Sequence, residues 1–306
     1  MKKEIILFLK SYNIEYKIIE NYIQLNNNIR LYIIDKPYEY RTNPTGKWKS
    51  NIENNDINKN YFKNITITNE LNDIRTIWIK SWEWENKTDI IKSYILTSIG
   101  IIENRFYARD TELRILTINE EKEFLKINSF YGYRPSSIAF GLFLKKDKGK
   151  YKKDELLFCL TIGKAYYGKG KYDIEVIRAA TLINCQVIGG MSKIWKYFLN
   201  NFEYLKIGNN IIKWETCVFY IDSDHNSGNS MYEIGFNYIG WSSPGFHNID
   251  INTNKMYMRN PKLHNQIMEE IKKGNIYQIF NTGNKIFLYN KILKQYINEN
   301  STFISE

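Results

Sequence analysis

Two adjacent glycines, Gly189 and Gly190, separate a segment with the pattern of a strand from a segment with the pattern of a helix. The strand pattern covers residues 172–183, and the helix pattern begins directly after the glycines. A helix that starts at a glycine turn has free backbone N–H groups at its N-terminus, and such groups bind phosphate or pyrophosphate. The candidate phosphate-binding residues are Gln186, Gly189, Gly190, Ser192 and Lys193. A tight turn without a ligand is the alternative.

The chain has 306 residues, which suggests two domains or one domain with a sizeable extension. Its 43% hydrophobic and 25% charged side chains are typical of a folded protein. The first domain is expected to be a small α/β unit over residues 1–100. Its expected elements are a helix from residue 5, strands over 29–35 and 74–84, a polar loop over 38–60 and a helix over 88–100.

The rest of the chain also alternates strand and helix patterns, so the expected fold class is α/β (α+β) throughout. The expected strands cover residues 106–116, 139–146, 155–163, 172–183, 217–222 and 237–241. Helices are expected over 118–130, from Gly190 to 202 and over 229–236. Residues 276–290 are expected to form a hairpin that turns at Thr282 and Gly283.

The chain carries 43 basic and 33 acidic side chains, a net charge of +10, which favours a polyanionic partner such as nucleic acid. Its abundance of Asn, Ile, Lys and Tyr is also typical of an AT-rich genome, which raises the lysine content without a role in binding.

Basic residues alternate with tyrosines in residues 131–134, 164–172 and 255–259, a pattern that binds phosphates and stacks on unpaired bases. DNA is therefore the expected partner. Phe246 and His247 belong to a further segment that we interpret as a base-contacting loop, with an exposed turn as the alternative. The candidate nucleic-acid-binding residues are Tyr133, Arg134, Lys164, Lys169, Lys171, Phe246 and His247.

The three cysteines form no CxxC pair, which argues against a disulfide framework and against a structural zinc site. The N-terminal apolar run is too short to span a membrane and lacks a cleavage site, so we expect a cytoplasmic protein without a membrane partner. Asp222, Asp224 and His225 are spaced so that they could hold a divalent metal such as iron or manganese, and a capped turn is the alternative.

The glycine turn and a later segment together resemble the acyl-CoA-dependent N-acetyltransferase (GNAT) fold. In that family a Q/R-x-x-G-x-G/A loop binds the pyrophosphate of coenzyme A, and Gln186, Gly189 and Gly190 stand in its place here. The segment from Asn229 to Phe236 resembles the family's later strand and helix element. The resemblance implies a mixed, mainly antiparallel sheet, with acetyl-CoA or another acyl-CoA as cofactor.

Within this fold the chain looks most like the Mom-type phage proteins that modify adenine in DNA. Arg178 matches that family's strand arginine, and Glu175 stands beside it as the acidic partner. Asp222 matches the Asp of a YAD-like strand, and Tyr232 matches the Tyr of the helix that follows. Such residues could bind charge, accept a proton from an amine, and act as an acid or stack on a base. A buried Glu175–Arg178 ion pair with Tyr232 in the core is the alternative.

A second resemblance covers residues 25–290 and is to phage mobile endonucleases, which join a very-short-patch-repair-like nuclease domain to a domain of this kind. The matches include Glu39, Trp48 and Ser50, with Glu83 or Glu85 at the family's acidic position. The family's histidines are replaced by Lys49 and Phe62, so the favoured interpretation is a degenerate nuclease domain. In an active one, the magnesium-binding oxygens would come from Asp35, Glu39 and Glu83.

The two resemblances together imply a degenerate nuclease-like domain over residues 1–100 and a GNAT/Mom-like domain with a basic C-terminal extension over 101–306. The leading hypothesis is a phage-type acyltransferase, acting in the host cytoplasm, that modifies a nucleobase amine in DNA. The alternatives are a homing or mobile DNA endonuclease and a non-catalytic DNA-binding protein. The acyl donor, the target base, the metal requirement and the oligomeric state stay open.

Overall fold

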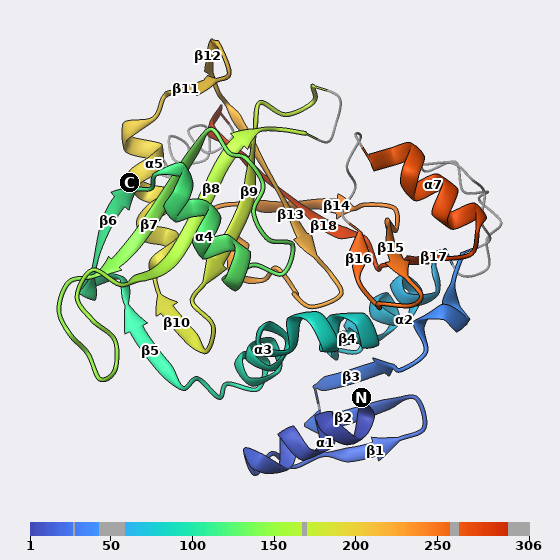
Figure 1. The fold of residues 1–306 in the computed structure, drawn as a ribbon. Coiled ribbons are helices and arrows are strands. Elements are labelled where there is room, and N and C mark those ends of the chain that lie inside the picture. The colour runs from blue at the N-terminus through green and yellow to red at the C-terminus, as the bar shows by residue number, and fades with distance from the viewer. Residues whose placement is uncertain (27, 43–58, 167–169, 258–262, 293–306) are drawn as a thin grey trace, which may run out of the picture. The chain divides into compact units, whose positions relative to one another are not determined.

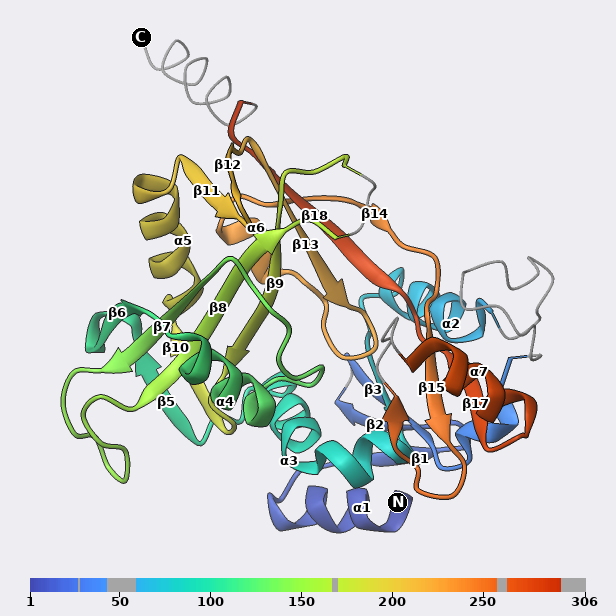
Figure 2. The same ribbon diagram turned by 45° about the horizontal axis from the view of Figure 1, so that its top comes forward.

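The computed structural model describes residues 1–26, 28–42, 59–166, 170–257 and 263–292 (Figures 1 and 2). The chain forms two compact units. Unit 1 consists of residues 1–100, 222–227 and 241–284, and unit 2 of residues 101–221, 228–240 and 285–306. The first division therefore falls at Gly100, where a domain boundary is expected, but two later segments also belong to unit 1.

The first part of unit 1 is a four-stranded sheet in the order β1-β2-β3-β4. The first three strands are antiparallel, whereas β3 and β4 are parallel and are connected through a helix. The elements are α1 (Lys2–Ser11), β1 (Lys17–Ile19), β2 (Tyr22–Asn26), β3 (Ile29–Ile34), η1 (Pro37–Tyr40), α2 (Tyr61–Glu70), β4 (Arg75–Lys80) and α3 (Ser81–Ser98). Most of the expected polar loop over 38–60 lies outside the described residues.

The strand expected over residues 74–84 ends earlier than its pattern predicts. β4 stops at Lys80, and Ser81 to Trp84 form the first turn of α3. A capping interaction explains this boundary, because the Glu83 carboxylate accepts a hydrogen bond from the backbone N–H of Lys80 at 2.8 Å. The alternating tryptophans Trp82 and Trp84 imitate a strand pattern but lie on a helix.

The second part of unit 1 is a three-stranded sheet in the order β16-β15-β17 with one helix beside it in the sequence. Its elements are β15 (Phe246–Asp250), β16 (Met256–Tyr257), α7 (His264–Lys272) and β17 (Ile276–Phe280). The hairpin expected over 276–290 is wrong. Gly283 does turn the chain with a φ of 81°, but β17 pairs with β15 over five residues and the following strand, β18 (Asn284–Asn290), joins another sheet.

Unit 2 is built on a seven-stranded sheet in the order β14-β18-β13-β9-β8-β7-β6. From β6 to β9 the neighbouring strands are antiparallel, while β9 and β13 are parallel. The strands are β6 (Thr111–Ile115), β7 (Ile138–Leu144), β8 (Leu156–Lys164), β9 (Ile174–Thr181), β13 (Thr216–Asp222), β14 (Asn237–Trp241) and β18. The mixed, mainly antiparallel sheet confirms the predicted α+β class.

Helices cover both faces of this sheet. The remaining elements of unit 2 are β5 (Asn104–Tyr107), η2 (Ala108–Asp110), α4 (Ile118–Asn128), β10 (Cys185–Ile188), α5 (Gly190–Asn201), β11 (Tyr204–Ile207), β12 (Asn210–Lys213) and α6 (Ser230–Glu233). Phe124 and Leu125 of α4 pack on Ala139 and Phe143 of β7, whereas Trp195 and Phe198 of α5 belong to the cluster that contains Phe140 and Leu142. Because alternate residues of a strand face opposite sides, α4 and α5 lie on opposite faces (Figures 1 and 2).

Within the described residues, no helix is both long enough and apolar enough to cross a bilayer.

Candidate functional site

The predicted glycine turn is present and opens α5. Gly189 is the N-cap of the helix and has a φ of 73°, a conformation that strains any residue with a side chain. Gly190 is buried, and a Cβ atom there would lie 3.0 Å from Val187 and 3.1 Å from Leu142. Close packing and a left-handed turn therefore both require glycine, and no described side chain caps this end of α5. The first-turn N–H groups keep the arrangement that suits a phosphate.

The other candidate phosphate-binding residues take different places. Gln186 is half-buried in β10, where it pairs with Arg105 of β5, and Ser192 is half-buried in the first turn of α5. The Lys193 ammonium donates hydrogen bonds to the backbone carbonyls of Ala108, at 2.8 Å, and Thr111. Burial lowers the pKa of Lys193, and the nearby Lys145 lowers it further. Lys193 thus holds the η2 turn against α5.

The parallel pairing of β9 with β13 covers only the first three residues of β9. Ile174 to Val176 pair with Cys217 to Phe219, and the register with β13 ends there. On the other side of β9, Ile162 opposes Val176 and Thr161 opposes Arg178, so Ile177 is an extra residue in a β-bulge. The bulge therefore lies where the pairing with β13 ends. Ligands of mixed sheets commonly bind at the carboxyl ends of adjacent parallel strands.

This bulge brings two predicted catalytic residues to the same face of β9. Residues three apart on a regular strand face opposite sides. Glu175 instead opposes Gly163 and Arg178 opposes Thr161, and these two partners are two residues apart on β8, so Glu175 and Arg178 face the same side. Sequence periodicity alone would place them on opposite faces.

Around these two residues lies an arginine–tyrosine cluster, which we define as Tyr131, Arg134, Tyr166, Glu175 and Arg178. Arg134 lies 3.9 Å from the Glu175 carboxylate and stacks over the Tyr166 ring, with 4.5 Å between its guanidinium carbon and the ring centroid. The backbone N–H of Tyr166 donates to Glu175 at 2.9 Å. Arg178 donates to the carbonyl of Gly132 at 3.0 Å and lies 5.8 Å from the centre of the Tyr131 ring.

Exposure differs within the cluster. Glu175 is buried, Arg134 and Arg178 are half-buried, and the Tyr166 ring is 66% exposed. The cluster therefore places a buried carboxylate 3.9 Å from one guanidinium group, on the same strand face as a second one, and next to a ring that water reaches. Such a set can bind an anion, stack on a planar base and accept a proton.

The other two predicted catalytic residues lie elsewhere. The Asp222 carboxylate accepts a hydrogen bond from the backbone N–H of Asp224 at 3.0 Å and lies 2.9 Å from Nδ1 of His225, both residues of unit 1. Tyr232 is on α6 with 55% of its side chain exposed, and its ring contacts the edge of Phe287. The alternative that places Tyr232 in the core is wrong.

Unit 1 contains a buried charge network, which we define as Lys80, Glu83, Asp224 and His225. Lys80 Nζ lies 2.6 Å from Asp224 and 3.5 Å from Glu83, and His225 Nε2 lies 3.5 Å from Glu83. Lys80, Glu83 and Asp224 are 0% exposed, and His225 is 1% exposed. The backbone N–H of Thr282 completes the network by donating to Asp224 at 3.0 Å.

Charge pairing in the network outweighs the effect of burial. Burial alone favours neutral groups, but Lys80 lowers the pKa of Asp224 to about 2. In the same way, burial disfavours a charged imidazole, yet Asp222 and Glu83 raise the pKa of His225 to about 10. The nearby His247 behaves in the opposite way, because burial and the charge of Lys80 lower its pKa to about 4.

We expect the free energy of unfolding of unit 1 to be largest near pH 6.5, the unfolded pKa of histidine. The raised pKa of His225 stabilises the fold fully below pH 6.5, and this stabilisation is lost as the pH rises towards 10. The lowered pKa of His247 acts on the acid side, because unfolding becomes more favourable as the pH falls from 6.5 towards 4. Urea denaturation across this range measures the profile. His247→Gln should flatten the acid limb alone, and a stability that rises between pH 7 and 9 would contradict the assignment.

The buried charge network contains two of the three predicted metal ligands, but a lysine accompanies them. Asp222, Asp224 and His225 do lie together, but the Lys80 ammonium occupies the position next to Asp224. In the described part of the chain, no group of three or more His, Cys, Asp or Glu side chains could hold a metal ion. Lys80 was not among the predicted site residues. A single lysine at the end of an otherwise apolar strand is nevertheless a signal for a buried ion pair.

The carboxylates expected in an active nuclease have separate surroundings. Asp35 lies 3.7 Å from the N-terminal ammonium of Met1, and the exposed Glu39 pairs with Lys36 at 3.2 Å. Glu83 belongs to the buried charge network, while Trp48, Lys49 and Ser50 lie outside the described residues. Phe62, which replaces a family histidine, is buried against Trp78.

The candidate nucleic-acid-binding residues divide into two groups. Tyr133 and Arg134 are half-buried beside β9, and Lys164 and Lys171 are exposed, while Lys169 lies outside the described residues. The structure corrects the expectation for Phe246 and His247. Both belong to β15, where they are only 4% and 9% exposed, and the His247 ring packs against Trp82. β15 has no alternating pattern, because Phe246 to Ile249 are all buried, so its polar residues gave no strand signal. Neither ring is available to a base.

No protein-family model and no curated protein matches this chain. Two features of unit 2 bear on its function: the glycine turn of α5 and the arginine–tyrosine cluster on β9.

Proposed function

We propose that unit 2 is an acyl-CoA-dependent transferase that acylates an exocyclic amine of a nucleobase in DNA. One observation carries the proposal: β9 and β13 are parallel, their register ends at a bulge in β9, and the chain between them forms a helix that begins at Gly189 and Gly190. The turn of α5 and the face of β9 that carries Glu175 and Arg178 lie on opposite sides of the sheet, so the acyl chain would pass between β9 and β13 beyond the point where their pairing ends.

The start of α5 fits the diphosphate of a coenzyme A. The left-handed Gly189 and the tightly packed Gly190 leave the backbone N–H groups without a side chain above them, and the positive end of the helix dipole favours an anion. Gly189, Gly190 and Ser192 would hold the cofactor, whereas Lys193 would position the turn. When bound, acyl-CoA supplies an activated acyl thioester.

The arginine–tyrosine cluster supplies the acid–base chemistry. An exocyclic base amine must lose a proton as its nitrogen becomes an amide, and Glu175 is the carboxylate of this face that would accept it. Arg178 and Arg134 would stabilise the charge on Glu175 and bind the nucleotide's phosphate. Tyr232 lies outside the cluster, on α6 against Phe287, so the departing thiolate would take its proton from solvent.

In this proposal Asp222 is not the proton acceptor. Its carboxylate oxygens already contact the backbone of Asp224 and the ring of His225, so we assign it to positioning the chain after β13.

DNA contact is supported by what surrounds Glu175. The 66% exposed Tyr166 ring offers a stacking surface next to Arg134, and the exposed Lys164 and Lys171 follow in the same part of the sequence. Lysine and arginine release counterions from phosphates, and aromatic rings stack on bases that leave the duplex. The net charge of +10 agrees with a polyanionic substrate.

The direct test is mass analysis of nucleosides from DNA incubated with the full chain and acetyl-CoA. We expect a new nucleoside heavier by one acyl group, absent when acetyl-CoA is omitted. DNA binding without any new nucleoside would favour a non-catalytic DNA-binding protein. Plasmid nicking in Mg²⁺ or Mn²⁺ that Asp35→Ala and Glu39→Ala abolish would favour the endonuclease.

Gly189→Val should weaken the binding of coenzyme A by about tenfold, because a side chain at positive φ costs roughly 1–3 kcal/mol and turns the N–H groups away. Calorimetry with acetyl-CoA measures the change. Gly208→Val is the matched control: Gly208 has a φ of 60° in the turn between β11 and β12, and nothing lies near its absent Cβ. Equal affinities for the two variants would contradict a cofactor site at α5.

A further inference from the structure

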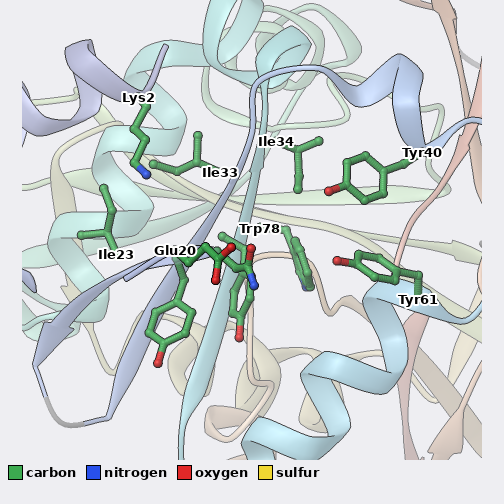
Figure 3. A pocket seen from close by; sticks show the side chains of 11 residues that line it. Lys2, Glu20, Ile23, Ile33, Ile34, Tyr40, Tyr61 and Trp78 are labelled. Carbon is green, nitrogen blue, oxygen red and sulfur yellow. The ribbon is translucent and has the colours of Figure 1, made fainter. Parts of the chain in front are cut away.

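Unit 1 contains a cavity of about 120 Å³, and five of the eleven residues that line it are aromatic (Figure 3). Tyr22, Tyr32 and Trp78 come from the sheet, Tyr40 comes from η1, and Tyr61 is the first residue of α2. Isoleucines of β2 and β3 fill the remaining wall. Neither the acyl transfer chemistry of unit 2 nor the buried charge network uses these residues.

The floor of the cavity is rigid. The Tyr32 and Trp78 rings lie 4.5 Å apart between centroids, on the parallel strands β3 and β4. The Trp78 indole donates to the Thr66 hydroxyl at 2.8 Å, and the Tyr32 hydroxyl accepts a hydrogen bond from Asn69 at 3.2 Å. Because α2 satisfies both polar atoms, the rings stay in place. Tyr32 is only 8% exposed and Trp78 is 0% exposed, so the accessible ring surface comes from Tyr22, Tyr40 and Tyr61.

The rim carries polar groups in addition to rings. Tyr40 and Tyr61 lie beside each other with 5.3 Å between ring centroids, and Figure 3 shows both hydroxyl groups directed towards Trp78. Tyr61 is 39% exposed, so the cavity opens to solvent on this side. Lys2 and the exposed Glu20 line the cavity as well and supply one cation and one carboxylate.

We propose that this cavity binds a single unpaired nucleobase presented by a nucleic-acid strand. At about 120 Å³ the cavity is smaller than the roughly 150 Å³ that holds a benzene molecule, so one edge of a base would enter it while the rest of the ring lies against the open rim. The accessible tyrosine rings can stack on any base, and the hydroxyls of Tyr40 and Tyr61 and the Glu20 carboxylate match the donors and acceptors on its edge. Lys2 would pair with the adjoining phosphate.

A nucleic-acid strand is favoured over a free nucleoside because only the strand carries phosphates, which Lys2 at the rim and the net charge of +10 would attract. The site depends on unit 1 alone, so it stands or falls independently of acyl transfer in unit 2.

Fluorescence anisotropy tests the proposal with two labelled oligonucleotides and the full chain. One strand contains a single cytidine flanked by abasic nucleotides, and the other is entirely abasic, so both carry the same phosphates. We expect the strand with one base to bind about tenfold more tightly, the size of effect that stacking of a base on aromatic side chains produces. Free cytidine, added as competitor, distinguishes the two sources: displacement only at far higher concentration identifies the strand as the ligand.

Tyr61→Leu should remove most of the difference between the two strands. Tyr38→Leu is the matched control, since Tyr38 is similarly exposed, at 41%, but lies outside the cavity and packs on Tyr277. Circular dichroism melting verifies that both variants fold. Equal affinities of the wild-type chain for the two strands would overturn the proposal. So would binding of tetramethylammonium, a probe for a cationic ligand, without any preference for the strand that carries the base.

Discussion

Replacing Lys80 by methionine is expected to lower the free energy of unfolding of unit 1 by about 3–5 kcal/mol. Methionine fills a similar volume but leaves Asp224 and Glu83 as buried carboxylates without their common cation. Both carboxylates are 0% exposed, so water cannot replace the lost ammonium. The cost is therefore that of an uncompensated buried charge, which is much larger than the value of an ion pair at the surface.

Hydrogen exchange measured by mass spectrometry on peptides from β4 and from residues 222–227 localises this loss to unit 1. Lys36→Met is the matched control, because the Lys36–Glu39 pair at 3.2 Å is exposed and its loss costs below about 1 kcal/mol. Combining Lys80→Met with Asp224→Leu should restore part of the stability. A Lys80→Met variant as stable as Lys36→Met would show that the network is dispensable.

Much of the fold could be predicted because its signals are local. The segments that form β3, β7, β8, β9 and β13 are short runs rich in apolar, β-branched and aromatic residues, which by themselves indicate strands. The helix α4 begins where Thr117 and Glu120 form a capping box, and α5 begins where two glycines stand. Each of these boundaries depends on neighbours a few residues apart in the sequence.

Features that depend on distant residues could not be predicted. The turn at Gly283 is visible in the sequence, but only the competing partner β15 shows that β17 and β18 separate. Likewise, Lys80 and Asp224 are 144 residues apart, so their contact leaves no local pattern. The sequence identified Asp224 and His225 as a chemical cluster but not the lysine that neutralises it.

The geometry of the candidate site also depends on a neighbouring strand and could not be predicted from local sequence. Glu175 and Arg178 could be selected by residue type, yet their common face depends on one extra residue, Ile177, in the pairing of β9 with β8. A bulge leaves no clear mark in hydrophobic periodicity. Arg134, which is 3.9 Å from Glu175, was selected as a DNA contact and not as a partner of the carboxylate.

Glu175→Gln is expected to lower the rate of acyl transfer to DNA by about 10²–10⁴-fold, the usual contribution of a positioned proton acceptor. Glutamine keeps an oxygen that can accept the hydrogen bond from the backbone of Tyr166, so the loop at residue 166 stays in place. What the substitution removes is the negative charge beside Arg134 and the capacity to take a proton. Single-turnover assays with saturating acetyl-CoA measure this step without a contribution from cofactor binding.

Glu121→Gln separates a catalytic effect from the general cost of altering a buried carboxylate. Glu121 is also in unit 2 and is 3% exposed, against 4% for Glu175, but it lies on α4 outside the arginine–tyrosine cluster. We expect Glu121→Gln to keep the rate within a few-fold of wild type, and both variants to bind DNA equally well. With Glu175 as the proton acceptor, the wild-type rate should rise with pH as this carboxyl group ionises, and Glu175→Gln should lose this pH dependence. Parallel losses of rate in the two variants, with an unchanged pH profile, would reduce Glu175 to a structural partner of Arg134.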